Sequence, residues 1–218
     1  MTAADLLSND IMPLSVNDSC RNALDSMNDL RISCIPVVDD RKLITLLSDN
    51  DIYRYDDLDG KIGDMKLNVA PFVYDNQHVF DVLKMFKMYH LPLLPVIDRF
   101  DNYLGVITFS GLIDYMADVL SVSEPGALIM IEMGVNDYSL GEIARLMEEN
   151  NAKILSLMLC NKTESSRITI CIKINLIDAS AVIQTLRRFD YNVSGSFDNV
   201  GNDDLRERFE SFMKFLDI

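Results

Sequence analysis

The apolar positions in the first half of the chain follow one pattern twice. Ile35-Pro36-Val37-Val38-Asp39 recurs as Leu94-Pro95-Val96-Ile97-Asp98, so that the two prolines stand 59 positions apart. In each copy the spacing predicts an amphipathic helix, a short buried strand opened by proline, a polar turn, a second apolar strand and a second helix. Because one copy of such a repeat usually cannot bury its own hydrophobic face, we expect the copies, residues 1–60 and 61–120, to pack together.

A different pattern follows a linker at residues 121–126, whose Pro125-Gly126 pair interrupts the periodicity. The elements expected in order are a strand at 128–133, a helix at 140–147, strands at 154–160 and 168–174, a helix at 181–189 and a strand at 191–197. Isoleucine alternates with more polar residues in the 168–174 strand, which indicates a sheet with one covered face. The order is that of the ferredoxin-like βαββαβ fold. The fold class is therefore α/β of the α+β type, with the second domain at 127–200.

The last segment, residues 201–218, has one apolar stripe at helical spacing. The stripe is formed by Leu205, Phe209, Phe212, Met213 and Leu216. We expect an amphipathic helix that docks either on its own domain or on a second chain, since aromatic residues gather at interfaces.

Charge and composition narrow the classes of function. The 218 residues include 34 acidic and 20 basic side chains, and the net charge of −14 would repel nucleic acid. The N-terminus lacks a basic start followed by an apolar stretch, and no apolar run approaches the ~20 residues that span a bilayer. The sequence therefore predicts a cytoplasmic protein with no nucleic-acid partner and no membrane insertion.

Cysteine and histidine give no sign of metal or catalytic chemistry. The four cysteines have no Cys-x-x-Cys spacing, so we expect reduced, buried thiols and no metal site. His78 and His90 stand at the two ends of a predicted helix, and no motif pairs either with a nucleophile. No glycine-rich phosphate loop of the P-loop or Rossmann type appears. We predict no catalytic residues and no enzyme activity.

The second strand-to-helix junction of each repeat carries a specific motif. The first reads Thr45-Leu46-Leu47-Ser48-Asp49-Asn50-Asp51, and the second reads Gly105-Val106-Ile107-Thr108-Phe109-Ser110-Gly111. Together with the helix-strand-strand-helix order over residues 8–120, these junctions resemble the tandem CBS motif, two copies of which form a Bateman module. The family pattern here is Gly-h-x-Ser/Thr-x-x-Asp. The first copy has threonine in the glycine position, and the second has glycine in the Asp position.

The resemblance implies a nucleotide site at these junctions. In the family the hydroxyl contacts a phosphate at the helix start, and the carboxylate accepts hydrogen bonds from both ribose hydroxyls. The candidate residues are Ile35, Thr45, Ser48, Asp51 and Thr108. The candidate ligands are AMP, ADP, ATP and S-adenosylmethionine. A purely structural interpretation also fits, in which Ser48 is an N-cap and Asp51 complements the helix dipole.

The second domain resembles the ACT family of small amino-acid-sensing modules, mainly in its topology. The family's ligand loop commonly reads Asp-x-Pro-Gly-x-Leu, whereas the turn here is Asn136-Asp137-Tyr138-Ser139-Leu140, without the proline and the glycine. The candidate residues for an amino-acid site are Gly134, Asn136, Asp137 and Ser139. Alternatively, Asn136 or Asp137 simply caps the following helix.

A CBS pair followed by an ACT-like domain is similar in architecture to the acetoin-utilisation accessory proteins. The resemblance implies a non-catalytic, homodimeric regulator that senses an adenine nucleotide or adenosine derivative and transmits binding as a conformational change. The alternative is a ligand-free dimeric scaffold that docks a metabolic enzyme or a transporter. The replaced motif residues Thr45, Gly111 and Ser139 favour the scaffold, whereas the intact Ser48 and Asp51 pair favours the sensor.

Overall fold

The structure is a computed structural model that describes residues 1–161 and 166–197. The chain divides into two compact units, Met1–Met116 and Ala117–Ile218. The division falls inside a helix, and the expected linker at 121–126 contains no helix or strand. The helix expected at 201–218 lies outside the described residues. No helix within the two described ranges is both long enough and apolar enough to cross a bilayer.

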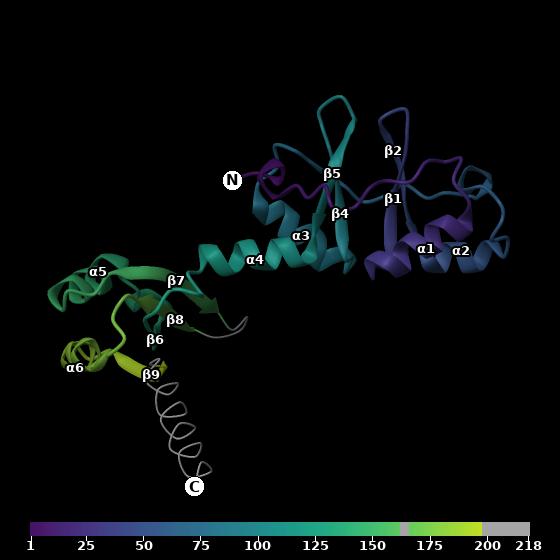
Figure 1. Cartoon of the computed structure of the whole chain (residues 1–218). Coiled ribbons are helices and arrows are strands. Elements are labelled where there is room, and N and C mark those ends of the chain that lie inside the picture. The colour runs from purple at the N-terminus through teal and green to yellow at the C-terminus, as the bar shows by residue number, and fades with distance from the viewer. Residues whose placement is uncertain (162–165, 198–218) are drawn as a thin grey trace, which may run out of the picture. The chain divides into compact units, whose positions relative to one another are not determined.

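The first unit contains the predicted repeat of helix, strand, strand and helix (Figure 1). The first copy consists of α1 (Cys20–Leu30), β1 (Cys34–Asp39), β2 (Lys42–Ser48) and α2 (Asp49–Tyr55). The second copy consists of α3 (Val79–Tyr89), β4 (Leu93–Ile97), β5 (Tyr103–Thr108) and α4 (Phe109–Val119). The remaining elements are the short 3-10 turns η1 (Ala3–Leu6) and η2 (Ile62–Asp64) and the two-residue strand β3 (Val73–Tyr74).

Polar side chains mark the ends of these helices. Ser19 caps α1 by accepting a hydrogen bond from the Asn22 amide at 3.2 Å. His78 does the same for α3, because its Nδ1 accepts from the Phe80 amide at 3.2 Å. His90 ends α3 in the left-handed conformation, with φ of 51°. The helix-end positions predicted for both histidines are therefore confirmed.

The two copies of the repeat are joined through their hairpins. β1 pairs antiparallel with β2, and β4 pairs antiparallel with β5. The Tyr103 amide donates to the Arg41 carbonyl at 2.8 Å, which connects the two hairpins. The N-terminal segment also reaches the second copy, because Ser8 forms a backbone bridge with Val106. Leu93 and Val106 are buried in the core of the first copy, so each copy completes the other as the repeat predicts.

Tyr103 gives a test of packing between the copies. Its hydroxyl is buried and has no hydrogen-bond partner among the described residues. An unsatisfied buried hydroxyl costs on the order of 1–3 kcal/mol, so we expect Tyr103→Phe to raise the free energy of unfolding by about 1 kcal/mol in urea titrations at pH 7. Reduced stability of the variant would show that the hydroxyl has a partner.

The effect of Tyr103→Phe should depend on pH. Burial raises the pKa of the Tyr103 phenol from 10.0 to about 12. Between these two values the phenol ionises in the unfolded chain but not in the folded one, so the parent loses stability as the pH rises. The variant has no such group. Its advantage over the parent should therefore grow from pH 10 towards pH 12.

The second unit has the predicted strand-helix-strand-strand-helix-strand order. Its elements are β6 (Ala127–Gly134), the 3-10 turn η3 (Val135–Asp137), α5 (Leu140–Glu149), β7 (Ile154–Asn161), β8 (Arg167–Ile174), α6 (Ser180–Arg188) and β9 (Asn192–Phe197). The sheet order is β7-β8-β6-β9, and every pair is antiparallel. This is the ferredoxin-like arrangement.

One face of this sheet packs against both helices. Burial alternates along β6, where Ala127, Ile129, Ile131 and Met133 are the buried residues. These side chains form one core with residues of α5 and α6, among them Ile143, Leu146, Val182 and Leu186. The covered face predicted from the alternation is confirmed.

The four cysteines are free thiols. Cys20, Cys34 and Cys171 are buried as expected, and burial raises the pKa of the Cys34 thiol to about 12. The expectation is wrong for Cys160, which is exposed. The reason is its position next to the last residue of β7, where the sheet ends.

Candidate functional site

The most complete candidate site lies at the start of α2, where β2 ends in Ser48. The Ser48 hydroxyl accepts a hydrogen bond from the Asp51 amide at 3.2 Å. The Asp51 carboxylate in turn accepts from the Ser48 amide at 3.1 Å and from the Ser48 hydroxyl at 2.6 Å. This reciprocal arrangement is a capping box. The structural role considered for these residues is therefore present.

The capping box leaves part of the Asp51 carboxylate unused. Both of its bonds to Ser48 use Oδ2. Oδ1 makes no hydrogen bond to the residues that the structure describes, and both side chains are only partly buried. An ionised carboxyl oxygen is a strong acceptor. The helix start thus retains one charged acceptor, whereas its first three amides already donate to the Ser33 carbonyl, the Asp49 carboxylate and the Ser48 hydroxyl.

Thr45 and Ile35, the other candidates in the first repeat, are core residues. Thr45 is 4% exposed, and its hydroxyl donates to the Asn68 carbonyl at 2.7 Å. Ile35 is 1% exposed and pairs in register with Leu47 on β2. Both side chains therefore shape the junction without offering a free polar atom to a ligand.

The junction of the second repeat has fewer polar groups that could bind a ligand. The Thr108 hydroxyl accepts from the Gly111 amide at 3.0 Å and from the Ser110 hydroxyl at 3.2 Å. Gly111 occupies the position where the family pattern has aspartate, so no carboxylate faces Thr108 from this position. Both junctions lead from a strand directly into a helix, but only the first has an acidic residue at the motif's last position.

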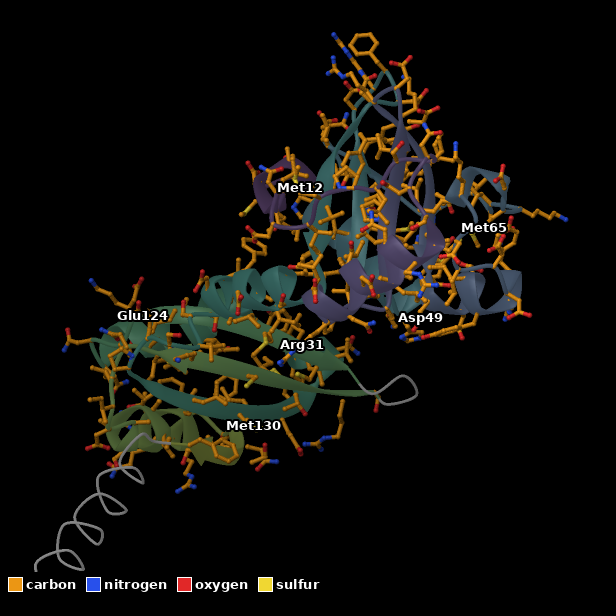
Figure 2. The ribbon with its side chains drawn as sticks, turned by 45° about the vertical axis from the view of Figure 1, so that its right-hand side comes forward. Met12, Arg31, Asp49, Met65, Glu124 and Met130 are labelled. Carbon is orange, nitrogen blue, oxygen red and sulfur yellow. The ribbon has the colours of Figure 1, made fainter. Side chains whose placement is uncertain are left out.

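Two cavities lie between the copies of the repeat. The larger, of about 350 Å³, is lined by Ser33, Phe86, His90, Leu91, Pro92 and Phe109. The Ser33 carbonyl accepts the amide of Asp49, the first residue of α2, at 3.1 Å. This contact places the cavity beside the first residue of α2, which is labelled in Figure 2, although neither Ser48 nor Asp51 is among the lining residues.

The smaller cavity, of about 170 Å³, shows that the two copies are not equivalent. It is lined by Lys42, Leu43, Ile44, Val69, Ala70, Phe72, Ile97 and Asp101. Tyr103, which follows Ile44 by the repeat spacing, is larger and packs against the core of the first copy. The two copies thus differ in the size of the side chain at this repeat position.

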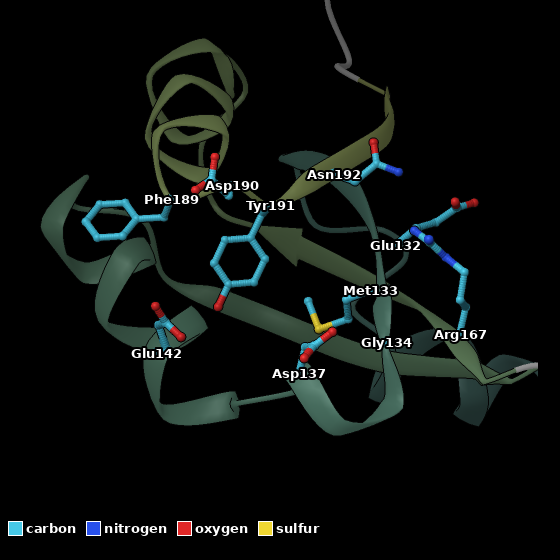
Figure 3. Close-up of a pocket in the computed structure, with 10 residues that line it drawn as sticks. All are labelled: Glu132, Met133, Gly134, Asp137, Glu142, Arg167, Phe189, Asp190, Tyr191 and Asn192. Carbon is cyan, nitrogen blue, oxygen red and sulfur yellow. The ribbon is translucent and has the colours of Figure 1, made fainter.

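A separate cavity of about 390 Å³ lies in the second unit (Figure 3). Its walls are formed by Glu132, Met133, Gly134, Asp137, Glu142, Arg167, Phe189, Asp190, Tyr191 and Asn192. Burial and a hydrogen bond to Glu142 raise the pKa of the Tyr191 phenol to about 12. The absence of a side chain at Gly134 lets the Asp137 carboxylate lie close to the backbone, since a Cβ at this position would be 2.5 Å from Asp137 Oδ2.

The predicted amino-acid loop only partly enters this cavity. Gly134 and Asp137 line it. Asn136 is exposed on η3. Ser139 caps α5, because its hydroxyl accepts from the Glu142 amide at 3.3 Å. The interpretation that Asn136 or Asp137 caps this helix is therefore wrong.

Sequence reasoning missed most of the cavity walls. The residues missed include Glu132, Glu142, Arg167, Asp190 and Tyr191. They come from β6, α5, β8 and the turn before β9, and no local motif connects them. They come together through the pairing of β6 with β9, which sets Glu132 opposite Asn192, the pairing of β6 with β8, which sets Gly134 opposite Arg167, and the packing of α5 on the sheet.

The repeat corresponds to a known domain. The CBS domain family matches residues 3–57 and 62–118, just over half of the 218 residues. The chain belongs to the CBS-domain family. The two spans coincide with the two copies of the repeat, so the resemblance inferred from the junction motifs is confirmed. The first unit is a CBS pair.

Solved structures are similar to part of this chain. A CBS domain pair/ACT domain protein from Thermotoga maritima matches at 19% identity and a TM-score of 0.51, over 55% of this chain and 99% of that one. A Vibrio cholerae protein assigned to acetoin utilization matches at 20% identity and a TM-score of 0.49, over 57% of this chain and 96% of that one. CBSX2 of Arabidopsis thaliana, solved in complex with AMP, matches at 19% identity and a TM-score of 0.47, over 54% and 97%.

Proposed function

We propose that this CBS-family chain is a non-catalytic, homodimeric regulator whose CBS pair binds an adenine nucleotide or an adenosine derivative at the Ser48–Asp51 junction. AMP, ADP, ATP and S-adenosylmethionine are the candidate ligands. The observation that carries the proposal is the unused Oδ1 of Asp51 at the start of α2. The cavity of about 350 Å³ beside that helix start supports it.

The chemistry of the junction suits such a ligand. Asp51 would accept hydrogen bonds from the ribose hydroxyls, and the Ser48 hydroxyl would turn towards a phosphate at the positive end of α2. Breaking the capping box costs about 1 kcal/mol, which the charged contacts to the ligand offset. A ligand held between the copies would favour one relative arrangement of them, limited by its differential affinity for the two states.

Nucleotide binding can be tested by thermal unfolding of the full chain with AMP, ADP, ATP and S-adenosylmethionine. A ligand at ~100 times its dissociation constant should stabilise the native state by about 2.7 kcal/mol. Asp51→Asn, which keeps the size of the side chain and removes its charge, should abolish most of that stabilisation. Asp49→Asn is the matched control, because Asp49 belongs to the same helical turn but not to the motif.

Two outcomes would contradict the proposal. If no compound stabilises the parent, the CBS pair is not an adenosine-ligand sensor under these conditions, and the scaffold alternative is favoured. If Asp51→Asn and Asp49→Asn respond like the parent, the ligand binds elsewhere. The exposed Phe109 and Ile113 on α4 are the observation that favours a dimeric scaffold docking an enzyme or a transporter, since apolar anchors gather at interfaces.

The second unit is proposed to be ACT-like and to hold a second ligand site at the loop containing Gly134, Asn136, Asp137 and Ser139. Its ferredoxin-like sheet order supports the first point. The cavity that Gly134 and Asp137 help to line supports the second. A free amino acid is the class of ligand that the resemblance suggests.

A further inference from the structure

The face of the second sheet that α5 and α6 do not cover carries a row of sulfur-containing side chains. The buried isoleucines of β6 and β8 pack under the helices, so the residues between them point to the opposite face. On that face Met130 of β6 lies opposite Cys171 of β8, and Cys171 lies opposite Met158 of β7. Cys160 follows Met158 by two residues and shares its face. The strand register thus aligns two thiols and two thioethers.

Cys171, at the centre of this row, has a buried and unpartnered thiol. The residue is only 7% exposed and forms no disulfide. Its thiol makes no hydrogen bond to residues 1–161 or 166–197. Burial and the nearby Cys160 raise the pKa of the Cys171 thiol, so Cys160 lies close enough to influence it. A metal ion displaces the proton of a coordinating thiol outright, and the raised pKa therefore does not prevent ligation.

The spacing of these side chains suits one small ion. Opposite residues on paired strands have Cβ atoms about 4.5–5.5 Å apart, and diagonal neighbours lie somewhat further apart. Metal–thiolate bonds of about 2.3 Å place two sulfur ligands of one ion up to about 4.6 Å apart. Met158 lies opposite Cys171, and Cys160 lies diagonal to it. Because Cys160 is exposed and Met158 has a long, flexible side chain, both can turn towards Cys171.

Met130 has a different place in the row. Its Sδ lies 3.8 Å from the position that a Cβ on Gly195 would occupy. Gly195 is the β9 residue opposite Met130, so this thioether lies on the β9 side of Cys171, away from β7. Met130, which is labelled in Figure 2, therefore covers the buried thiol from that side, and the other three sulfurs remain as ligands.

The set of ligands favours a soft, monovalent metal. Thiolate and thioether ligands together select Cu(I). Zinc takes thiolate, imidazole and carboxylate ligands. Within the described parts of the chain, no group of three or more His, Cys, Asp or Glu side chains could hold a metal ion. The two thiols here have a thioether beside them in place of a third ligand of that kind.

We propose that Cys160, Cys171 and Met158 form a Cu(I) site on the uncovered face of the second sheet. Both thiols release their protons to solvent when the ion binds, and no electron is transferred. The site is separate from the two ligand sites proposed above. The spacing of the cysteines along the chain gives no sign of it, because the sulfurs meet only when β7 pairs with β8.

Anaerobic titration of the full chain with Cu(I), in competition with the chelator bathocuproine disulfonate, tests the site. We expect one ion to bind per chain, with an ultraviolet thiolate-to-copper charge-transfer band, and zinc not to displace it. Loss of a group that merely orients a metal ligand costs about 10–100-fold in affinity. Cys160→Ser and Cys171→Ser should therefore each weaken Cu(I) binding by at least about 100-fold, and Met158→Leu by at least about tenfold.

Matched controls exist for both kinds of ligand. Cys34→Ser removes a thiol from the first unit, and Met133→Leu removes a thioether from the covered face of β6. Both should leave Cu(I) affinity unchanged. Circular dichroism checks that each variant is folded. Cys160→Ser keeps the test decisive if Cys171→Ser fails to fold, because Cys160 is exposed.

Three results would overturn the proposal. Failure of the parent to take Cu(I) from the chelator would exclude the site. Equal weakening by Cys34→Ser and Cys160→Ser would mean that Cu(I) binds thiols throughout the protein. Displacement of Cu(I) by zinc, or unchanged affinity in Met158→Leu, would exclude a ligand set selected by its thioether. None of these results bears on the nucleotide titration of the CBS pair.

Discussion

Replacing Gly126 by alanine should reduce the free energy of unfolding of the second unit by about 3 kcal/mol. Gly126 is buried where the chain enters β6, and an added Cβ would lie 1.9 Å from the Ile174 carbonyl oxygen. The Ile174 carbonyl is backbone, and the chain around Gly126 is held in place because the Ala127 amide donates to the Leu176 carbonyl at 2.7 Å. Relief of the clash requires a shift of the backbone where β6 pairs with β8.

Gly141→Ala is the matched control for this prediction. Gly141 lies in the first turn of α5, and an added Cβ would meet nothing within 4 Å. Alanine is favoured over glycine in a helix by about 0.5–1 kcal/mol, so this variant should be slightly more stable than the parent. Urea unfolding followed by far-UV circular dichroism measures both changes. A Gly126→Ala protein as stable as the parent would show that β6 and β8 do not approach this closely.

The second large effect is expected at Ile52, the buried residue of α2. Ile52 is fully buried in the core of the first repeat copy, whereas its neighbour Tyr53 is 65% exposed. Truncating a fully buried isoleucine leaves a cavity and typically costs 2–5 kcal/mol. We expect Ile52→Ala to lose about 3 kcal/mol of stability and Tyr53→Ala to lose less than about 0.5 kcal/mol.

The Ile52→Ala variant should also affect the proposed ligand site. α2 begins at the capping box of Ser48 and Asp51, so weak docking of the helix should also displace these groups. Urea unfolding measures the stability of Ile52→Ala and Tyr53→Ala, and the nucleotide titration can be repeated at a temperature where both remain folded. A loss below about 1 kcal/mol for Ile52→Ala would mean that the core around α2 is not closely packed.

The junction motif illustrates which features of the site can be predicted from the local sequence. Ser48 and Asp51 stand three residues apart at a strand-to-helix boundary, and this spacing predicts an N-cap serine with an acid in the first helical turn. It equally predicts the family's nucleotide site, because both roles use the same two groups at the same helix start. The structure shows a capping box through Oδ2 of Asp51 and does not test the nucleotide role. That the Thr45 hydroxyl is held by Asn68 could not be foreseen, since the contact joins distant parts of the chain.

The sequence by itself determined the repeat, the order of helices and strands in both units, and the covered face of the second sheet. These follow from local periodicity, because a helix or strand with one apolar face must bury it wherever it lies. Only the tertiary structure decided the cavity of the second unit. Glu132 and Asp190 are far apart in the chain and become neighbours when β9 pairs with β6. Charged side chains at strand ends look like ordinary surface residues in a sequence, and their shared site exists only once the sheet has formed.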